Sequence, residues 1–197
     1  MKKIFLLIIT AIAFNNLYAQ DFKTDITTAR SSYAKGDLAD AHYALEQALQ
    51  EIDITIGKEV LKLLPAKMGD MSVNMSDDNV YANAGFIGTT IHRSYGTTRK
   101  ADLSIISNSP LVATINAFLN TPMLGGMMSD GTTKMVKVQG YKSQLQKEAN
   151  SDGTNNYTIS LPLGNSLVTF KVDKTTDTEI LSFANTLPLE AIAKLIQ

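Results

Sequence analysis

Cysteine and tryptophan are absent from this sequence of 197 residues, and histidine occurs only twice. Without cysteine the chain cannot form a disulfide, so its stability must come from an ordinary hydrophobic core. A bacterial lipoprotein anchor needs a cysteine directly after the signal cleavage site, and the residue at the expected place is Gln20. The motifs of P-loops, dinucleotide-binding folds and zinc sites are absent as well. Several common classes of enzyme and of anchored protein are therefore excluded.

Neither sign of charge dominates, because 18 lysines and arginines stand against 19 aspartates and glutamates. Loss of an N-terminal segment with Lys2 and Lys3 would leave a small acidic excess. A nucleic-acid backbone demands a basic face, and a polybasic membrane anchor demands clustered lysine or arginine. We therefore expect no nucleic-acid partner and no electrostatic attachment to a membrane.

Long apolar runs are also missing, apart from a short one at the N-terminus. Lys2 and Lys3 precede the uncharged, largely apolar residues 4–14, and Ala19 is a small residue at which signal peptidase would cut. This run is too short for a bilayer core, which needs roughly 20 residues. We expect residues 1–19 to be a removable signal peptide and the mature protein to be periplasmic or secreted, without a membrane anchor. A retained N-terminal anchor is the alternative, because Leu17 is bulky for its position before the cut.

Residues 20–65 have the pattern of a helical hairpin. Gly36 suits the residue that follows a helix, and Asp37 suits the N-cap of the next one. The pattern resembles a single tetratricopeptide unit, but such units stack in about three copies and no second copy follows. Gly57 is expected to bend or weaken the second helix, and Pro65 to end it. Three- and four-residue steps predict one apolar stripe that docks on the rest of the chain or on a partner: Ala41, Leu45, Ala48, Leu49, Ile52 and Ile56.

Residues 66–197 are predicted to form an α+β domain, an antiparallel sheet with helices packed on one face. Glycine, asparagine, serine and aspartate crowd residues 69–85, and short β-type runs follow them. Short alternating segments separated by turn residues predict the strands that follow. These strands are 89–95, 101–106, 136–138, 141–146, 157–161 and 168–172.

Helix signals interrupt and follow these strands. Ser109 is a natural N-cap and Pro110 suits the first helical position, which predicts a helix that Pro122 ends. Thr176 and Glu179 form a capping-box pattern, and helix resumes at Pro188. The order of elements supports the α+β class.

A series of short motifs in the second part of the chain resembles a known group of proteins. The motifs are Leu64-Pro65, Arg93-Ser94-Tyr95, Ser109-Pro110-Leu111, Asn120-Thr121-Pro122, Val138-Gln139-Gly140 and Leu161-Pro162-Leu163-Gly164-Asn165. In this order they resemble a family of exported hypothetical proteins of Gram-negative bacteria over about residues 60–197. The resemblance implies an exported bacterial protein and brings no activity, cofactor or site residue with it.

His92 and Arg93 are the first place to look for an enzymatic site, because they place an imidazole and a guanidinium side by side in the predicted sheet. A histidine-assisted nucleophile needs a hydroxyl within hydrogen-bond reach and a third group that orients the base. Ser94 and Ser104 are the nearest serines, and neither lies in a nucleophile-elbow motif. The simpler interpretation is a histidine at the edge of the core. His42, the other histidine, is expected at the solvated edge of its helix.

Methionines form two groups, Met68, Met71 and Met75, and then Met123, Met127 and Met128. Thioethers are soft ligands that suit Cu(I), so the second group predicts a copper site if it is not loop packing. Two oxygen-rich stretches, 77–79 and 150–156, are interpreted as turns instead of calcium loops, because the second lacks EF-hand spacing and a closing glutamate.

The sequence therefore shows no group of residues suited to acid–base catalysis, nucleophilic catalysis or cofactor binding. We assign no catalytic or cofactor-binding residue. The leading hypothesis is an exported, soluble, non-enzymatic binding or interaction module with an unidentified protein or small-molecule partner. An extracytoplasmic enzyme with a site near His92 and Arg93 is one alternative. A methionine-based Cu(I)-handling protein is the other.

Overall fold

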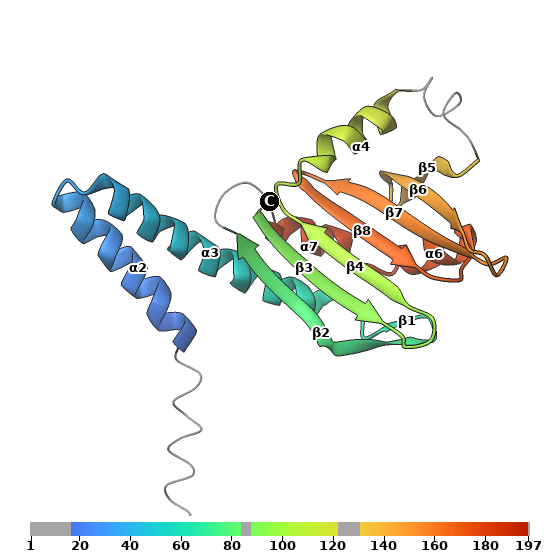
Figure 1. The fold of residues 1–197 in the computed structure, drawn as a ribbon, viewed down its shortest axis with the longest axis horizontal. Coiled ribbons are helices and arrows are strands. Elements are labelled where there is room, and N and C mark those ends of the chain that lie inside the picture. Colours follow the sequence, from blue (N-terminus) through green and yellow to red (C-terminus); the bar gives the residue numbers. More distant parts are fainter. Residues whose placement is uncertain (1–16, 84–87, 122–130, 197) are drawn as a thin grey trace, which may run out of the picture. The chain divides into compact units, whose positions relative to one another are not determined.

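The computed structural model describes residues 17–83, 88–121 and 131–196. Two helices come first, and an eight-stranded sheet with further helices follows (Figure 1). The chain divides into two compact units, residues up to Thr55 and residues from Ile56 onward. The elements are α2 (Leu17–Ala34), α3 (Leu38–Leu63), β1 (Lys67–Met68), β2 (Met71–Asn83), β3 (Gly88–Tyr95), β4 (Ala101–Ile106), α4 (Leu111–Asn120), β5 (Thr133–Val138), β6 (Tyr141–Ala149), β7 (Asn155–Leu163), β8 (Ser166–Val172), α6 (Asp177–Ala184) and α7 (Leu189–Ile196).

In the first unit, α2 and α3 form the predicted helical hairpin. Gly36 adopts the left-handed conformation (φ 81°) between them, and the Asp37 carboxylate accepts a hydrogen bond of 3.1 Å from the Asp40 N–H. Both predicted helix-end signals are thus confirmed. The Ser32 hydroxyl donates to the Asp40 carboxylate across the hairpin. The buried seam of the hairpin consists of small side chains, namely Ala29, Ser32, Ala41, Ala44 and Ala48.

The prediction of a single buried stripe on α3 is wrong. Its alanines are buried, but Leu45 is 49% exposed, Leu49 is 61% exposed and Ile52 is 42% exposed. At about 100° per residue, these three side chains lie roughly a quarter turn away from the alanines. The alanine side of α3 allows close approach of α2, and the bulkier side stays in solvent.

All strand pairs in the second unit are antiparallel, in the order β1-β2-β3-β4-β8-β7-β6-β5. The β3–β4 pair is the hairpin predicted around Gly96, and β6 to β8 form a meander with the predicted turns. The β4–β8 pair joins the two halves, with Leu103 opposite Phe170 and Ile105 opposite Val168. Each of the six predicted strands is confirmed.

One face of the sheet carries the main hydrophobic core. The last turn of α3 contributes Val60, the residue that follows the helix is Leu64, α6 contributes Ile180, and α7 contributes Leu189 and Ile192. Side chains from alternating strand positions complete the core: Ile91, Tyr95, Ala101, Leu103, Ile105, Leu145, Ile159, Leu161, Val168, Phe170 and Val172. The α+β fold class, a helical hairpin followed by an antiparallel sheet with helices on one face, is therefore confirmed. Helix α4 contacts β6, β7 and β8, and its buried Leu119 is not part of this core cluster.

Two details of the second unit differ from expectation. Residues 77–79 were expected to form a turn, but they lie within the strand Met71–Asn83, which pairs with β3. Gly57 is more than a weak point in α3, because a Cβ there would lie 2.4 Å from Val80 Cγ1 and 3.2 Å from Ile91 Cγ1. The glycine permits α3 to lie directly on β2 and β3.

Capping of the later helices follows the sequence only in part. The Thr176 hydroxyl accepts a hydrogen bond of 3.2 Å from the Glu179 N–H, which confirms the predicted start of α6. The first helical residue of α4 is Leu111, and its N-cap is Pro110 without a side-chain cap. Ser109, the expected N-cap, instead donates its N–H to the Asn165 carbonyl at 3.1 Å. This bond ties the start of α4 to the β7–β8 turn.

Candidate functional site

A large bulge in β2 brings acidic side chains to β3. Asn74 pairs with Ser94 and Asn79 pairs with His92, so β2 has three more residues in this interval than β3. The extra residues include Asp77 and Asp78, which the sequence analysis placed in a turn. That prediction is wrong, because both aspartates lie within the strand. A bulge re-aims side chains, and here the two carboxylates contact side chains on opposite faces of β3.

On the core face, Asp78 binds Arg93. The Arg93 Nε donates to Asp78 Oδ1 at 2.8 Å, Nη2 donates to Oδ2, and Nη1 donates to the Leu64 carbonyl at 3.3 Å. The side chains of Arg93 and Asp78 are only 9% and 18% exposed. The hydrogen-bonded carboxylate raises the pKa of Arg93 above its ordinary value. Because this guanidinium already holds a buried carboxylate and a helix-end carbonyl, it serves as a structural clamp.

Tyr95 lies two residues further along the same face and is completely buried. Burial raises its pKa to about 12, and the nearby Arg93 charge opposes that rise. The phenol oxygen has no hydrogen bond of acceptable geometry. Because burial disfavours the charged phenolate, this residue is not an accessible acid.

His92 lies on the opposite face of β3, away from Arg93. Its Nε2 is 3.4 Å from Asp102 Oδ1, and its Nδ1 is 3.3 Å from the Asp77 carbonyl. The Ser94 hydroxyl donates to Asp77 Oδ2 at 2.7 Å, and the Asn74 amide donates to the Ser94 oxygen at 3.0 Å. The His92 side chain is 36% exposed.

This cluster contains a histidine, a carboxylate and a hydroxyl. It lacks the hydrogen bond from hydroxyl to histidine that a histidine-assisted nucleophile needs. Ser94 donates to Asp77 instead of His92, and Ser104 lies directly opposite His92 on β4 without a hydrogen bond to it in the described part of the chain. The structure therefore separates the predicted pair: the Arg93 side chain is buried on the core face of β3, and the His92 side chain lies on the opposite face. The enzymatic alternative stays a hypothesis without an assembled catalytic set.

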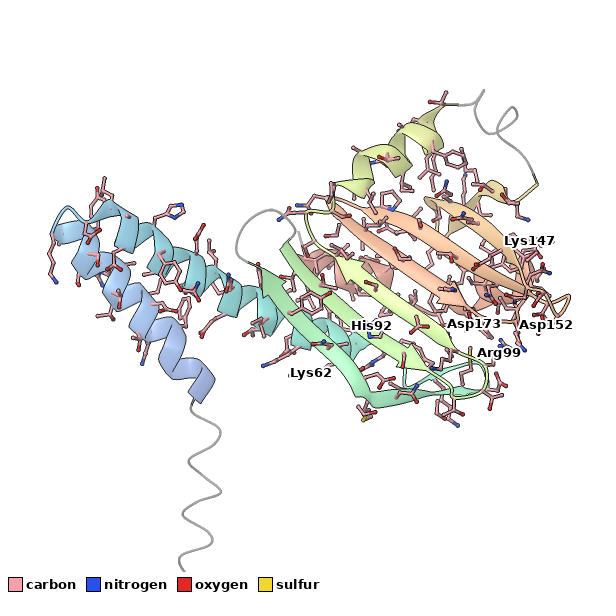
Figure 2. The ribbon with its side chains drawn as sticks, viewed as in Figure 1. Lys62, His92, Arg99, Lys147, Asp152 and Asp173 are labelled. Atoms are coloured by element: carbon pink, nitrogen blue, oxygen red, sulfur yellow. The ribbon has the colours of Figure 1, made fainter. Side chains whose placement is uncertain are left out.

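A hollow of about 330 Å³ lies at the β3–β4 turn, which sequence reasoning treated only as a turn. Arg99 is one of its lining residues, together with Asp70, Ser72 and Asn74. The Arg99 Nη2 lies 2.8 Å from Glu179 Oε1, and the guanidinium carbon lies 5.5 Å from the centre of the Phe183 ring. Figure 2 shows Arg99 at the tip of this hairpin, away from His92.

The charge of Arg99 is already balanced within the protein. Burial alone would raise the pKa of Glu179, but hydrogen bonds from Thr175 and Arg99 lower it below its ordinary value. The Thr175 hydroxyl donates to Glu179 Oε2 at 2.7 Å. With Glu179 paired and Asp70 beside it, the hollow presents no excess positive charge for an anion.

The first methionine group does not form a site. Met68 and Met71 are buried, and Met75 in the bulge is 73% exposed. The Met68 sulfur accepts a hydrogen bond from the Thr186 hydroxyl at 3.5 Å. Met123, Met127 and Met128 lie outside the described residues, so the copper hypothesis for them stays a prediction. In the ranges described, no three histidine, aspartate or glutamate side chains are grouped so that they could hold a metal ion.

The oxygen-rich segment 150–156 is a hairpin turn, as expected. Asp152 accepts hydrogen bonds from the Thr154 hydroxyl and the Thr154 N–H, and it lies 2.9 Å from Lys174 Nζ. These contacts, the Thr154 hydroxyl first, lower the pKa of Asp152 well below its ordinary value. The Asp152 carboxylate therefore stabilises the turn through these contacts.

The most unusual surface of the described chain is on the helical hairpin. Of the twelve large apolar side chains that are exposed among the described residues, seven belong to the first unit, although it is the smaller one. We define the apolar flank as the exposed or half-buried side chains on one side of the alanine seam: Phe22, Ile26 and Tyr33 of α2, and Leu38, Leu45, Leu49 and Ile52 of α3.

Helix geometry places these side chains on the same side of the hairpin. At about 100° per residue, the α2 members lie roughly 80° from the buried side of α2, and the α3 members lie roughly 90° from the buried side of α3. Because the helices run in opposite directions, as Figure 1 shows, both rotations lead to the same flank. Tyr43, also exposed, points away from it. Contiguous exposed apolar surface of this kind marks interaction sites.

No protein-family model, no curated protein and no solved structure matches the chain. The resemblance of residues 60–197 to exported bacterial proteins accordingly stays a prediction. Among the described residues, none of the helices combines the length and apolar character needed to cross a membrane.

Proposed function

We propose that this chain is an exported, non-enzymatic interaction module that acts in the periplasm or outside the cell after loss of residues 1–19. The apolar flank carries the proposal. Its α3 side chains are 42% to 62% exposed, and they repeat at steps of three, four and seven residues along the helix. That spacing is the pattern with which an amphipathic helix meets another helix or a groove.

The arrangement of the second unit supports the same conclusion. Two ion pairs of its described residues that are largely shielded from solvent, Arg93 with Asp78 and Arg99 with Glu179, join elements of the fold to each other. The His92 cluster is satisfied by neighbouring backbone and side-chain groups. In the second unit these polar side chains serve the fold. In the hairpin the large apolar side chains are exposed and can contact another molecule.

Site-specific photo-crosslinking tests the proposal. A photoreactive phenylalanine analogue replaces Leu49 in the full-length gene, and the chain is irradiated in the cell that produces it. Replacement of Tyr43, which is 60% exposed but points away from the flank, is the matched control. We expect a covalent protein adduct from position 49 and none from position 43.

Further positions make the result decisive. Photoreactive groups at Leu45 and Ile52 should give the same adduct as position 49, because all three share one side of α3. Absence of any adduct from all three positions would overturn the proposal. Equal adducts from position 43 would also overturn it, since contact would then not be specific to the flank.

A further inference from the structure

The charges that border the apolar flank differ between its two edges. On α2, Lys23 and Arg30 lie beyond the apolar side chains at the outer edge, about 140° to 160° from the buried side of that helix. On α3, Glu46 and Asp53 lie at the opposite outer edge, beyond Leu45, Leu49 and Ile52, and Glu46 Oε1 lies 3.7 Å from His42 Nδ1 on the same helix. One edge is therefore basic and the other acidic.

We propose that the apolar flank binds the same flank of a second copy of this chain, so that two hairpins form a four-helix bundle. This inference rests on the proposed function and names its partner. The side chains on the flank are those that a helix bundle buries in its centre, and the alanine seam already holds the two helices of each hairpin close together.

Two copies can bring their flanks together about a twofold axis in either of two orientations. The charges at the edges of the flank favour one of them. A twofold axis perpendicular to the helices would place α2 on α2 and α3 on α3, so that like charges would meet. A twofold axis parallel to the helices places α2 of one copy on α3 of the other. The basic edge of each hairpin then faces the acidic edge of its partner, and each pair of neighbouring helices is antiparallel, as in common four-helix bundles.

The levels of the charged residues agree with this second arrangement. The hydrogen bond between Ser32 and Asp40 shows which residues of α2 and α3 lie side by side. Counting from it at 1.5 Å per residue, Lys23 is level with residue 49, roughly 5 Å from the levels of both Glu46 and Asp53. Arg30 is level with residue 42, about 6 Å from Glu46. A parallel axis preserves these levels, and lysine and arginine side chains reach across such offsets.

The extent of the flank fits a dimer interface. From Leu38 to Ile52 it runs about 20 Å along α3, and two helices side by side give it a similar width. A two-helix face of this size buries accessible surface of the order found in stable complexes, roughly 800 Å² on each partner. Aromatic side chains at two points, Phe22 and Tyr33, are of the type that carries much of the binding energy in interfaces.

The test uses paired charge reversals in the chain from Gln20 onward, with molar mass measured by light scattering at about 100 µM and low salt. We expect the wild type to have twice the monomer mass. Lys23→Glu with Arg30→Glu should be monomeric, and so should Glu46→Lys with Asp53→Lys. An equimolar mixture of these two variants should return to the dimer mass, because each variant restores the complementary edge of the other.

Controls separate this outcome from general damage. The exchange Lys23→Arg with Arg30→Lys keeps both charges and should remain dimeric. Leu45→Glu should give a monomer, whereas Tyr43→Glu, on the other side of α3, should not. Circular dichroism of every variant verifies that the helices are intact.

Two results would overturn the second copy as the partner. One is a monomeric wild type, and the other is a dimer that the charge reversals leave unchanged. If the photo-crosslink at position 49 then links the chain to a different protein, the proposed interaction module survives and only the identity of the partner is wrong. An adduct of twice the chain mass supports both proposals, and no adduct at all removes both.

Discussion

Arg93 and Asp78 form a two-pronged ion pair on the core face of the sheet, although they lie fifteen positions apart on different strands. The pair depends on the β2 bulge, which carries Asp78 to the guanidinium. The same guanidinium reaches the Leu64 carbonyl near the end of α3. One arginine thus fixes the bulge, the strand and the helix end together.

Replacement of Arg93 by methionine should destabilise the protein by about 3–5 kcal/mol, because it leaves the mostly buried Asp78 carboxylate without its partner. Urea unfolding measures the change. The double variant Arg93→Met with Asp78→Leu should recover a large part of the loss, since no unpaired charge remains. Lys137→Met, at an exposed lysine on β5, is the control and should change stability by less than about 0.5 kcal/mol. A similarly small effect at Arg93 would contradict the clamp.

Tyr95 makes the folded state sensitive to alkali. Its pKa is about 12 in the folded protein against 10.0 for an ordinary tyrosine, so the unfolded chain loses this proton first as pH rises. Stability should therefore decline between pH 10 and 12, by up to about 3 kcal/mol from this residue. Tyr95→Phe removes the ionisable group and should flatten that decline relative to wild type in unfolding experiments at pH 9, 10 and 11.

Tyr43→Phe is the matched control, because Tyr43 is 60% exposed and lies away from the apolar flank. It should leave the alkaline decline unchanged. At pH 7, Tyr95→Phe should have little effect, since the buried hydroxyl has no hydrogen-bond partner to lose. A loss of several kcal/mol at pH 7 would show that the hydroxyl is bonded.

Local sequence signals predicted much of the second unit. Gly96, Gly153 and Gly164 all adopt positive φ at turns, and the alternation of Leu103 and Ile105 with polar neighbours marked a strand with one wet face. Such signals act within a few residues of the chain. For that reason the strands and the start of α6 were predictable without knowledge of tertiary contacts.

The missed strand β2 had no such signal. Its aspartates, asparagines and serines favour turns in isolation, and only β3 provides the partners that hold them in a strand. In the folded chain Ser94 donates a hydrogen bond to the Asp77 carboxylate, and Arg93 donates one to the Asp78 carboxylate. The candidate site around β3 was likewise unpredictable in its arrangement, because adjacent residues His92 and Arg93 point to opposite faces of a strand.

The same limit explains the error on α3. Alanine and leucine both count as apolar in a helical pattern, so the sequence predicted one stripe where the structure has two sides. The difference is steric, because only the small side chains Ala41, Ala44 and Ala48 allow α2 to approach. The remaining leucines became the exposed flank.

Gly57→Ala should destabilise the protein even though alanine favours helix by about 1 kcal/mol. The added methyl group would lie 2.4 Å from Val80 Cγ1, and a β-branched valine has little freedom to move aside. We expect a net loss of about 1–3 kcal/mol in urea unfolding. Adding Val80→Ala should make room and recover part of it. A stabilising Gly57→Ala would mean that α3 does not press on β2.

The end of α3 should belong energetically to the sheet unit, which a comparison of two fragments can test. Val60 is completely buried and Leu64 is 6% exposed, and both side chains belong to the core with Tyr95 and Ile91. Burial of two such side chains contributes about 1.5–3 kcal/mol each. A fragment of residues 66–197 lacks both side chains and also the Leu64 carbonyl that accepts from Arg93. We expect it to melt on the order of 10 °C below a fragment of residues 56–197.

The variant Val60→Ala with Leu64→Ala in the longer fragment should reproduce most of this difference while keeping the backbone. Equal melting temperatures for the two fragments would show that α3 contributes nothing to the core of the sheet.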